Sequence, residues 1–517
     1  MSSLYSIVIP TRERPDVLRY AIKTVLKQTR PNYELVVMDN CGSPETRAVV
    51  EEFADPHIRY FRSPERLSMS DNWERALEHV HGDYIAYLGD DDGLMPDAVE
   101  VAERFHRERP ELIVSWLPFE WRWPDAVKES ERNRSRMYLG SRAELTSSRD
   151  LLVDIYASRQ HFVRLPSIYC SFVPVRLVET ARTSQGRYFN SPIPDTYSGL
   201  VNLAFSEEFV YSFRPLSTWG VSRHSIGSSQ VYNVGESHGV FNSENLESWG
   251  NQVDERLSER DFIVEVLVAD VYLKAKQSLF PDDDEISLDM ESFLNYLCQT
   301  NIARRFHTME DRFRNAIREM ATKNGLDPER FIPMFPDDPA YPKLDYTTDV
   351  ARDVTHFFWF TQPSDVRTIE DFVDYAFRLC AAPEEIALID PREPQPPPTS
   401  GARKLVYDLT QTCQERLALI DELNRVCVER QTVIDDLQRA CDERLRVIEE
   451  QALAIEEKQR LIADLAASAD ERLRLIQELT QVLRERERAS ADLEAADERP
   501  GLLGGNEGAR TDGTLRP

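Results

Sequence analysis

The chain has 517 residues, too many for one ordinary hydrophobic core, so we expect two or three folded units. It carries 62 Lys and Arg against 90 Asp and Glu, a formal net charge of −28 at pH 7. So acidic a chain argues against general binding to nucleic acid or anionic lipid, because both require clustered positive charge. Binding of a nucleotide through a metal ion stays open.

The N-terminus and the cysteines predict a compartment. The opening MSSLYSIVIPTRERPD is typical of a strand and a loop, not of a secretory signal, and no run reaches the roughly 18 apolar residues of a membrane-spanning helix. The seven cysteines are scattered and form no CxxC pair, which disfavours a disulfide scaffold or a zinc site. We therefore expect a protein of the reducing cytosol, without a transmembrane segment.

Composition divides the chain into regions. Residues 1–235 alternate short apolar runs with amphipathic stretches and predict an α/β domain. Residues 236–382 have helical apolar spacing and predict a helical accessory domain, and 383–402 predict an extended Pro-rich linker. A periodic segment, 403–488, is followed by a tail, 489–517, that we expect to be disordered.

The periodic segment repeats every two heptads. Apolar residues or cysteines occupy every seventh position from Cys413 to Leu483, and the position three residues further alternates leucine with arginine or another polar residue. This pattern predicts a coiled coil of roughly 130 Å through which the chain forms a homo-oligomer. The alternative is a solitary charged helix, which would leave the apolar stripe in water.

The first domain begins with a strand, a helix and a strand. The run SIVIP predicts a buried strand before Thr11, and ELVVM predicts a second strand before Asp39. In open α/β sheets ligands bind beyond the carboxyl ends of the strands, where both residues are expected to lie. The fingerprint GxGxxG is absent after the first strand, which disfavours a dinucleotide-binding fold.

Three consecutive carboxylates follow the third predicted strand, YIAYL. Asp90, Asp91 and Asp92 repel one another unless a cation neutralises them. Oxygen ligands of this kind suit Mg²⁺ or Mn²⁺, which in turn bind a diphosphate. A solvated acidic turn is the alternative, and the strand context favours the metal.

These segments together resemble a known family. SIVIPTRERPDVLRYAIKTVLKQTRPNYELVVMDN and NWERALEHVHGDYIAYLGDDDGLMPDA are similar to the GT-A fold of family 2 glycosyltransferases. The resemblance implies a Rossmann-like mixed sheet and a metal-dependent inverting transfer of sugar from a nucleoside diphosphate sugar to a glycan or lipid-linked glycan. It also implies a role in bacterial surface polysaccharide synthesis and, for such acceptors, work at the inner face of the membrane.

The resemblance also implies site residues. The nucleotide base and ribose would be bound by Pro10, Thr11, Arg12, Glu13 and Asp39. The metal, Mn²⁺ or Mg²⁺, would be bound by Asp90 and Asp92, with His224 as a further ligand. The diphosphate would be bound by Asp90 and Asp91, with Arg223 as a charge partner of the leaving group. The family's usual pattern is Leu-Asp-x-Asp-Asp, and this chain has Gly89 at the first acid or a motif shifted by one residue.

Downstream, the resemblance implies a general base at Asp195. The alternative for Asp195 is an N-cap before an apolar helix. His224 is alternatively structural, and Trp116, Trp121 and Trp123 are either a platform for an acceptor sugar or core residues. Two other functions remain: an assembly protein with a degenerate transferase domain, and a nucleotidyltransferase, which would need a Gly-rich basic loop that the first strand lacks.

Overall fold

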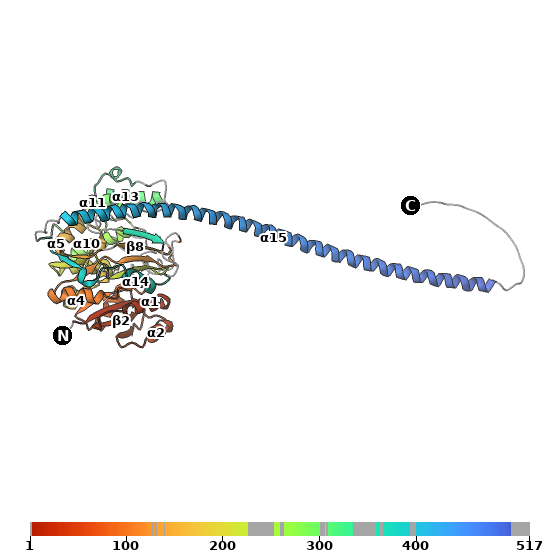
Figure 1. Cartoon of the computed structure of the whole chain (residues 1–517), viewed down its shortest axis with the longest axis horizontal. Helices are drawn as coiled ribbons and strands as arrows, with labels where there is room; N and C mark the ends of the chain where they lie inside the picture. Colours follow the sequence, from red (N-terminus) through yellow and green to blue (C-terminus); the bar gives the residue numbers. More distant parts are fainter. Residues whose placement is uncertain are drawn as a thin grey trace. The chain divides into compact units, whose positions relative to one another are not determined.

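The computed structural model describes residues 3–126, 129, 132–138, 140–225, 253–258, 263–299, 306, 309–333, 335, 357–361, 366–392 and 400–497. The chain forms two compact units, Met1–Gln395 and Pro396–Pro517 (Figure 1). No helix within the described ranges is long and apolar enough to cross a membrane.

The first unit is built on a nine-stranded mixed sheet with the order β14-β9-β11-β6-β10-β4-β1-β2-β3. Its strands are β1 (Tyr5–Thr11), β2 (Tyr33–Asp39), β3 (Ile58–Arg62), β4 (Tyr84–Tyr87), β6 (Val114–Trp116), β9 (Arg142–Ser147), β10 (Ser171–Pro174), β11 (Glu208–Ser212) and β14 (Ala387–Ile389). Strands β4, β1, β2 and β3 are parallel, and β10 runs antiparallel to β4 and β6. The predicted GT-A-like α/β class, with a Rossmann-like mixed sheet, is confirmed.

Helices connect the parallel strands because both faces of the sheet are apolar. Along β1, Val8 belongs to one core while Ile7 and Ile9 belong to another, as expected for a strand covered on both sides. The helices of the first 225 residues are α1 (Pro15–Val25), α2 (Pro44–Glu51), α3 (Met69–Ala76), α4 (Ala98–Glu108), α5 (Ser148–Tyr156), α6 (Val175–Gln185) and α7 (Pro194–Ala204).

A second sheet of five strands has the order β13-β8-β7-β12-β5. Its strands are β5 (Gly93–Leu94), β7 (Phe119–Arg122), β8 (Arg134–Tyr138), β12 (Ser217–Val221) and β13 (Phe357–Thr361). Strand β5 directly follows the three aspartates and pairs antiparallel with β12. This pairing brings the end of β12 to the acidic turn, although the two segments lie more than a hundred residues apart in sequence.

The predicted boundary near residue 235 is not a boundary between compact units. The later helices are α10 (Val264–Leu279), α11 (Met290–Leu297), α13 (Glu310–Lys323) and α14 (Ile369–Phe377). Helix α10 packs on α7, while α14 packs on α1 and β5, and all four helices contribute to the same apolar core as the first 225 residues. The predicted helical accessory domain 236–382 is therefore part of the first unit, because its apolar faces have no separate core.

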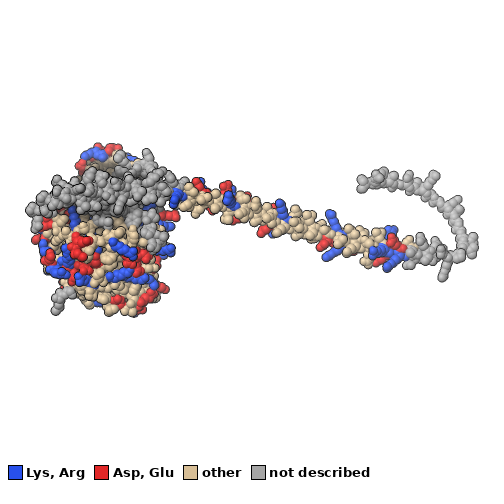
Figure 2. Space-filling model, in the orientation of Figure 1, with Lys and Arg blue, Asp and Glu red and all other residues tan. Residues whose placement is uncertain are grey.

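The linker and the tail also differ from prediction. Within 383–402, β14 pairs with β9, so part of the Pro-rich segment extends the sheet. Helix α15 spans Ser400–Asp497, so it contains the predicted periodic segment and the first residues of the predicted tail. Its described part carries interspersed acidic and basic side chains (Figure 2). Residues 393–399 and 498–517 lie outside the described ranges, and the pairing of α15 with another helix stays a prediction.

Candidate active site

The three aspartates lie where β4 ends and the chain turns into β5. Asp90, Asp91 and Asp92 are buried, at 3%, 5% and 4% exposure. Burial is the largest cause that raises the pKa of Asp90 and Asp92, and the neighbouring charge of Asp91 raises both further. The turn therefore concentrates negative charge that the protein or a ligand must neutralise.

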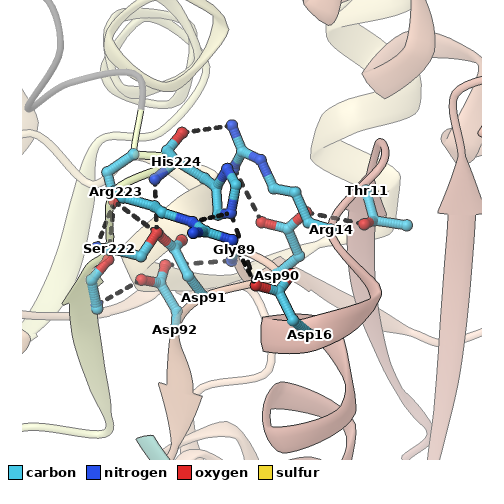
Figure 3. A network of polar contacts seen from close by, with 12 residues as sticks. Thr11, Arg14, Asp16, Gly89, Asp90, Asp91, Asp92, Ser222, Arg223 and His224 are labelled. Atoms are coloured by element: carbon cyan, nitrogen blue, oxygen red, sulfur yellow. Dashed lines mark hydrogen bonds and ion pairs between the residues drawn. The ribbon is translucent and has the colours of Figure 1, made fainter. Parts of the chain in front are cut away.

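Asp90 is bound by the loop after β1 (Figure 3). Its Oδ2 accepts a hydrogen bond of 2.8 Å from the Thr11 hydroxyl, and its Oδ1 forms an ion pair of 3.0 Å with Arg14 Nη1. Arg14 Nη2 also donates to the backbone carbonyl of His224, at 2.5 Å. One arginine thus connects the first loop, the acidic turn and the segment after β12.

Asp91 and Asp92 are bound by β12 and the turn after it. Asp91 Oδ2 accepts hydrogen bonds of 2.6 Å from the hydroxyls of both Ser222 and Ser225. Asp92 Oδ1 accepts from the Gly220 amide at 2.7 Å. The segment 220–225 is therefore bonded to the acidic turn through Gly220, Ser222 and Ser225.

The side chains of Arg223 and His224 contact each other and Asp16. Arg223 Nε donates to His224 Nε2 at 2.9 Å, and His224 Nε2 lies 3.6 Å from Asp16. His224 is the largest cause that lowers the pKa of Asp16, by a side-chain hydrogen bond. The backbone carbonyl of His224 accepts from Arg14, which pairs with Asp90, and the role of the His224 ring as a metal ligand stays a prediction.

The carboxylates suit a metal by their chemistry. Carboxylate oxygens are the ligands that Mg²⁺ and Mn²⁺ prefer, and the raised pKa values of Asp90 and Asp92 indicate that further positive charge would stabilise their ionised forms. Among the described residues, no three His, Cys, Asp or Glu side chains are placed to hold a metal ion. The donor set fits a hard divalent cation, and protein donors now occupy most of its oxygens.

Asp39 ends β2 at the same edge of the sheet and is fully buried. Its Oδ1 accepts from the Gly42 amide at 2.8 Å, and its Oδ2 accepts from the Tyr60 hydroxyl at 2.6 Å. Burial is the main cause that raises its pKa. These bonds orient the carboxylate that the resemblance assigns to the nucleotide.

The loop after β1 supplies the other predicted nucleotide residues. Pro10 and Arg12 are partly exposed, and Glu13 is exposed with a φ of 55°, the left-handed region. Glu13 Oε2 accepts from the Ser43 amide at 3.2 Å, which links this loop to the start of α2. The structure thus places the loop, Asp39 and the acidic turn at the carboxyl ends of adjacent parallel strands.

Asp195 lies in the first turn of α7. The N-cap residue is Ile193, so the alternative that Asp195 is the N-cap is wrong. Asp195 Oδ1 accepts from the Thr196 amide at 2.8 Å, and burial raises its pKa. The charges of both Asp92 and Asp195 contribute to the raised pKa of Cys170, after the larger effect of burial, so both carboxylates lie near that residue.

The tryptophans are core residues. Trp116, Trp121 and Trp123 are 1%, 0% and 6% exposed, which excludes a solvent-facing sugar platform in this structure. Trp123 Nε1 donates to the backbone carbonyl of Asp91 at 3.1 Å, so this side chain stabilises the backbone of the acidic turn.

Sequence reasoning missed four side chains of the site. Arg14 stands two residues after the predicted Arg12, in the same polar loop, and that position was its only signal. Ser222 and Ser225 flank the predicted residues Arg223 and His224, but serines alone indicate no role. Tyr169 bonds to Asp92 and carries no sequence signal, because it reaches the site only through the pairing of β10 with β4.

Comparisons with known proteins agree with this geometry. Residues 6–156 match the family described as Glycosyl transferase family 2. The putative teichuronic acid biosynthesis glycosyltransferase TuaG of Bacillus subtilis is 27% identical over 110 residues, 20% of this chain and 43% of TuaG. The UDP-Glc:alpha-D-GlcNAc-diphosphoundecaprenol beta-1,3-glucosyltransferase WfgD of Escherichia coli is 33% identical over 98 residues, 19% of this chain and 39% of WfgD.

The matches are partial. The chain spans less than half the length of these two relatives. Among solved structures, Staphylococcus aureus TarS aligns with 63% of this chain and 54% of its own, at 12% identity and a TM-score of 0.35, which is too low to carry an argument. The likeness to this family therefore rests on the sequence match over residues 6–156.

Proposed function

We propose that this chain, which contains a family 2 glycosyltransferase domain over residues 6–156, moves a sugar from a nucleoside diphosphate sugar to an acceptor hydroxyl. The observation that carries the proposal is the convergence of Asp39, the acidic turn Asp90–Asp92 and the first loop at one edge of the parallel strands. Ligands of open α/β sheets bind at this edge.

Each part of the site has a task in this reaction. Asp39 and the loop Pro10–Glu13 bind the base and ribose, and the acidic turn would hold Mn²⁺ or Mg²⁺ beside the diphosphate. When bound, the metal supplies positive charge that stabilises the nucleoside diphosphate as it leaves. Arg223 and His224 follow β12 directly beside the acidic turn, and they contact the phosphates of the donor.

Asp195 is the proposed general base. Its carboxylate takes the proton of the acceptor hydroxyl as that oxygen forms a bond to the anomeric carbon, and the bond from that carbon to the diphosphate breaks. Attack from the face opposite the leaving group inverts the anomeric configuration. The raised pKa of Asp195 suits this task, because a stronger base accepts the proton more readily.

The names of the relatives suggest an acceptor class. The name of WfgD contains a diphosphoundecaprenol acceptor, and that of TuaG refers to teichuronic acid biosynthesis. These names favour a glycan or lipid-linked glycan acceptor in surface polysaccharide synthesis. A lipid-linked acceptor would be met at the cytoplasmic face of a membrane, through partner proteins.

Helix α15 is the proposed oligomerisation element. Ile448, Ile455 and Ile462 recur every seven residues and are 60%, 56% and 65% exposed. Exposed apolar stripes of this length are costly in water, and a second copy carries the same stripe and interspersed charges, which makes it a fitting partner.

A donor panel tests the transferase. The full chain is incubated with UDP-, GDP-, dTDP- and CMP-sugars, with and without Mn²⁺, and free nucleotide is measured with and without a polyprenyl-diphosphate glycan acceptor. We expect metal-dependent release from one donor class and its loss in Asp92→Asn. The matched control is Asp83→Asn, at the opposite end of β4, where Asp83 binds only the Leu4 amide at 2.9 Å among the side-chain contacts described.

The second candidate is an assembly protein whose transferase domain is degenerate. The length of α15 and its exposed stripe favour this candidate. It predicts that a cell carrying Asp91→Asn with Asp92→Asn keeps its surface polysaccharide, whereas the transferase predicts its loss. Neither release nor metal-dependent nucleotide binding across the panel would also favour the assembly protein.

A further inference from the structure

The position before the three aspartates has no room for a side chain. A Cβ added at Gly89 would lie 2.1 Å from the Tyr169 hydroxyl oxygen and 2.6 Å from Asp92 Oδ2. Both distances are well below van der Waals contact. The Tyr169 hydroxyl therefore occupies the space into which a residue at position 89 would point.

The same hydroxyl is bonded to Asp92. A side-chain hydrogen bond from Tyr169 lowers the pKa of Asp92, against the larger raising effects of burial and of Asp91. A phenol hydroxyl donates and a carboxylate oxygen accepts, so Asp92 is the acceptor of this bond.

The Tyr169 ring is held rigidly. It stacks on Trp73 with ring centroids 5.6 Å apart and an interplanar angle of 4°. Trp73 is 5% exposed and packs in turn against Tyr87, at the end of β4. A ring fixed by packing can hold a carboxylate in one orientation at little entropic cost.

Tyr169 also lies in the segment that contacts the candidate base. It is the middle residue of a short 3₁₀ turn, Ile168–Cys170. The Ile168 amide donates to Ser198 Oγ at 3.2 Å, and Ser198 Oγ donates to the Asp195 carbonyl at 2.7 Å. A continuous chain of bonds therefore joins Asp92 to the first turn of α7.

We propose that Tyr169 is a positioning residue of the donor site: its hydroxyl fills the space at position 89 and holds Asp92 for the donor's diphosphate. The diphosphate ligand in this inference rests on the proposed transferase function, whereas the packing of Tyr169 against Gly89 and Asp92 does not depend on that function. It also explains why Gly89 is required here, since a larger residue would displace the hydroxyl.

A double-mutant cycle tests the geometry without any ligand. In the full chain, Gly89→Ala is expected to lower the melting midpoint by about 3–6 °C, because it overpacks a buried site. In the Tyr169→Phe background the same change is expected to cost less than half of that shift. Equal shifts in both backgrounds would overturn the claim that the hydroxyl fills position 89.

Nucleotide binding tests the role. UDP, GDP, dTDP and CMP are each titrated into the full chain with Mn²⁺ and followed by calorimetry. Tyr169→Phe is expected to raise the Kd of the preferred nucleotide about 10-fold, the loss of one hydrogen bond to a charged group. The control Tyr188→Phe removes another buried hydroxyl, bonded to Asn202 at 2.7 Å, and should leave that Kd unchanged.

The two failures are distinguishable. Wild-type binding with an unchanged Kd in Tyr169→Phe would refute the positioning role and leave the transferase standing. No binding of any nucleotide by the wild type would refute the donor site itself, and with it the role of Tyr169 there, while the melting cycle would still decide what occupies position 89.

Discussion

The acidic turn and helix α15 place side chains in opposite environments: the turn buries carboxyl groups, and the helix exposes apolar side chains to water. Asp90, Asp91 and Asp92 are charged and buried, and each accepts hydrogen bonds from distant segments. Ile448 and Ile462 on α15 are apolar and more than half exposed. A buried charge requires partners within its own unit, whereas an exposed apolar stripe is satisfied by another chain. The first arrangement supports the proposed transferase site, and the second supports the proposed association through α15.

The largest expected effect concerns Asp195, and it tests whether the site next to the buried aspartates carries out the proposed transfer. Asp195→Asn removes the base but keeps the size of the side chain, so kcat should fall about 1000-fold while donor binding persists. Steady-state kinetics with the identified donor and acceptor measure this. The matched control is Asp150→Asn, because Asp150 also lies in the first turn of a helix, α5, and is exposed.

The dependence of the wild-type activity on pH also tests whether Asp195 is the general base. Burial raises the pKa of Asp195, and a general base acts only when ionised. Activity should therefore fall as pH falls through this raised pKa, at a higher pH than for an ordinary aspartate. A profile that stays flat down to the ordinary aspartate range would argue against Asp195 as the base.

The next effect concerns the packing of α14 behind the site. Phe372 is fully buried and stacks against Trp121, with centroids 6.0 Å apart. Phe372→Ala should lower the free energy of unfolding of the first unit by about 3–5 kcal/mol, measured by denaturant titration of tryptophan fluorescence. Leu379→Ala, at 47% exposure, should change it by less than about 0.5 kcal/mol. Equal effects would mean that α14 does not belong to the core.

A third prediction tests association through α15. Ile448→Asp with Ile455→Asp places charges in the apolar stripe and should convert the oligomer to a monomer in sedimentation experiments. Ala463→Asp with Ala467→Asp adds the same charge outside the stripe and should leave the oligomer intact. A wild-type chain that sediments as a monomer at micromolar concentration would refute association through α15, since α15 would then be a solitary helix.

The smallest effect concerns the ion pairs between α1 and α14. Lys27 Nζ lies 2.8 Å from Asp374 Oδ2 and 3.0 Å from Glu370 Oε1, and all three side chains are partly exposed. Lys27→Met should cost less than about 1 kcal/mol of unfolding free energy, because solvent screens such pairs. The difference should shrink further in 1 M salt, at about a 3 Å Debye length. A larger loss would show that α14 depends on these charges more than on its apolar face.

Local patterns predicted the helix and the first strands. The heptad repeat predicted α15 because side-chain spacing along a helix depends only on nearby residues. The run before Thr11 and the run before Asp39 predicted β1 and β2 for a similar reason. Asp39 and the three aspartates were found because each stands directly after a buried strand, and the resemblance to a family supplied their roles.

Tertiary structure decided which distant residues complete the site. Ser222 and Tyr169 bond to the aspartates because β12 pairs with β5 and β10 pairs with β4, and Arg14 reaches Asp90 because β1 lies beside β4. Likewise, α14 joined the first unit because its apolar face fits α1 and β5, which no periodicity reveals. Such contacts depend on which surfaces meet after folding, so a single sequence determined the elements and the acidic turn, and packing determined their partners.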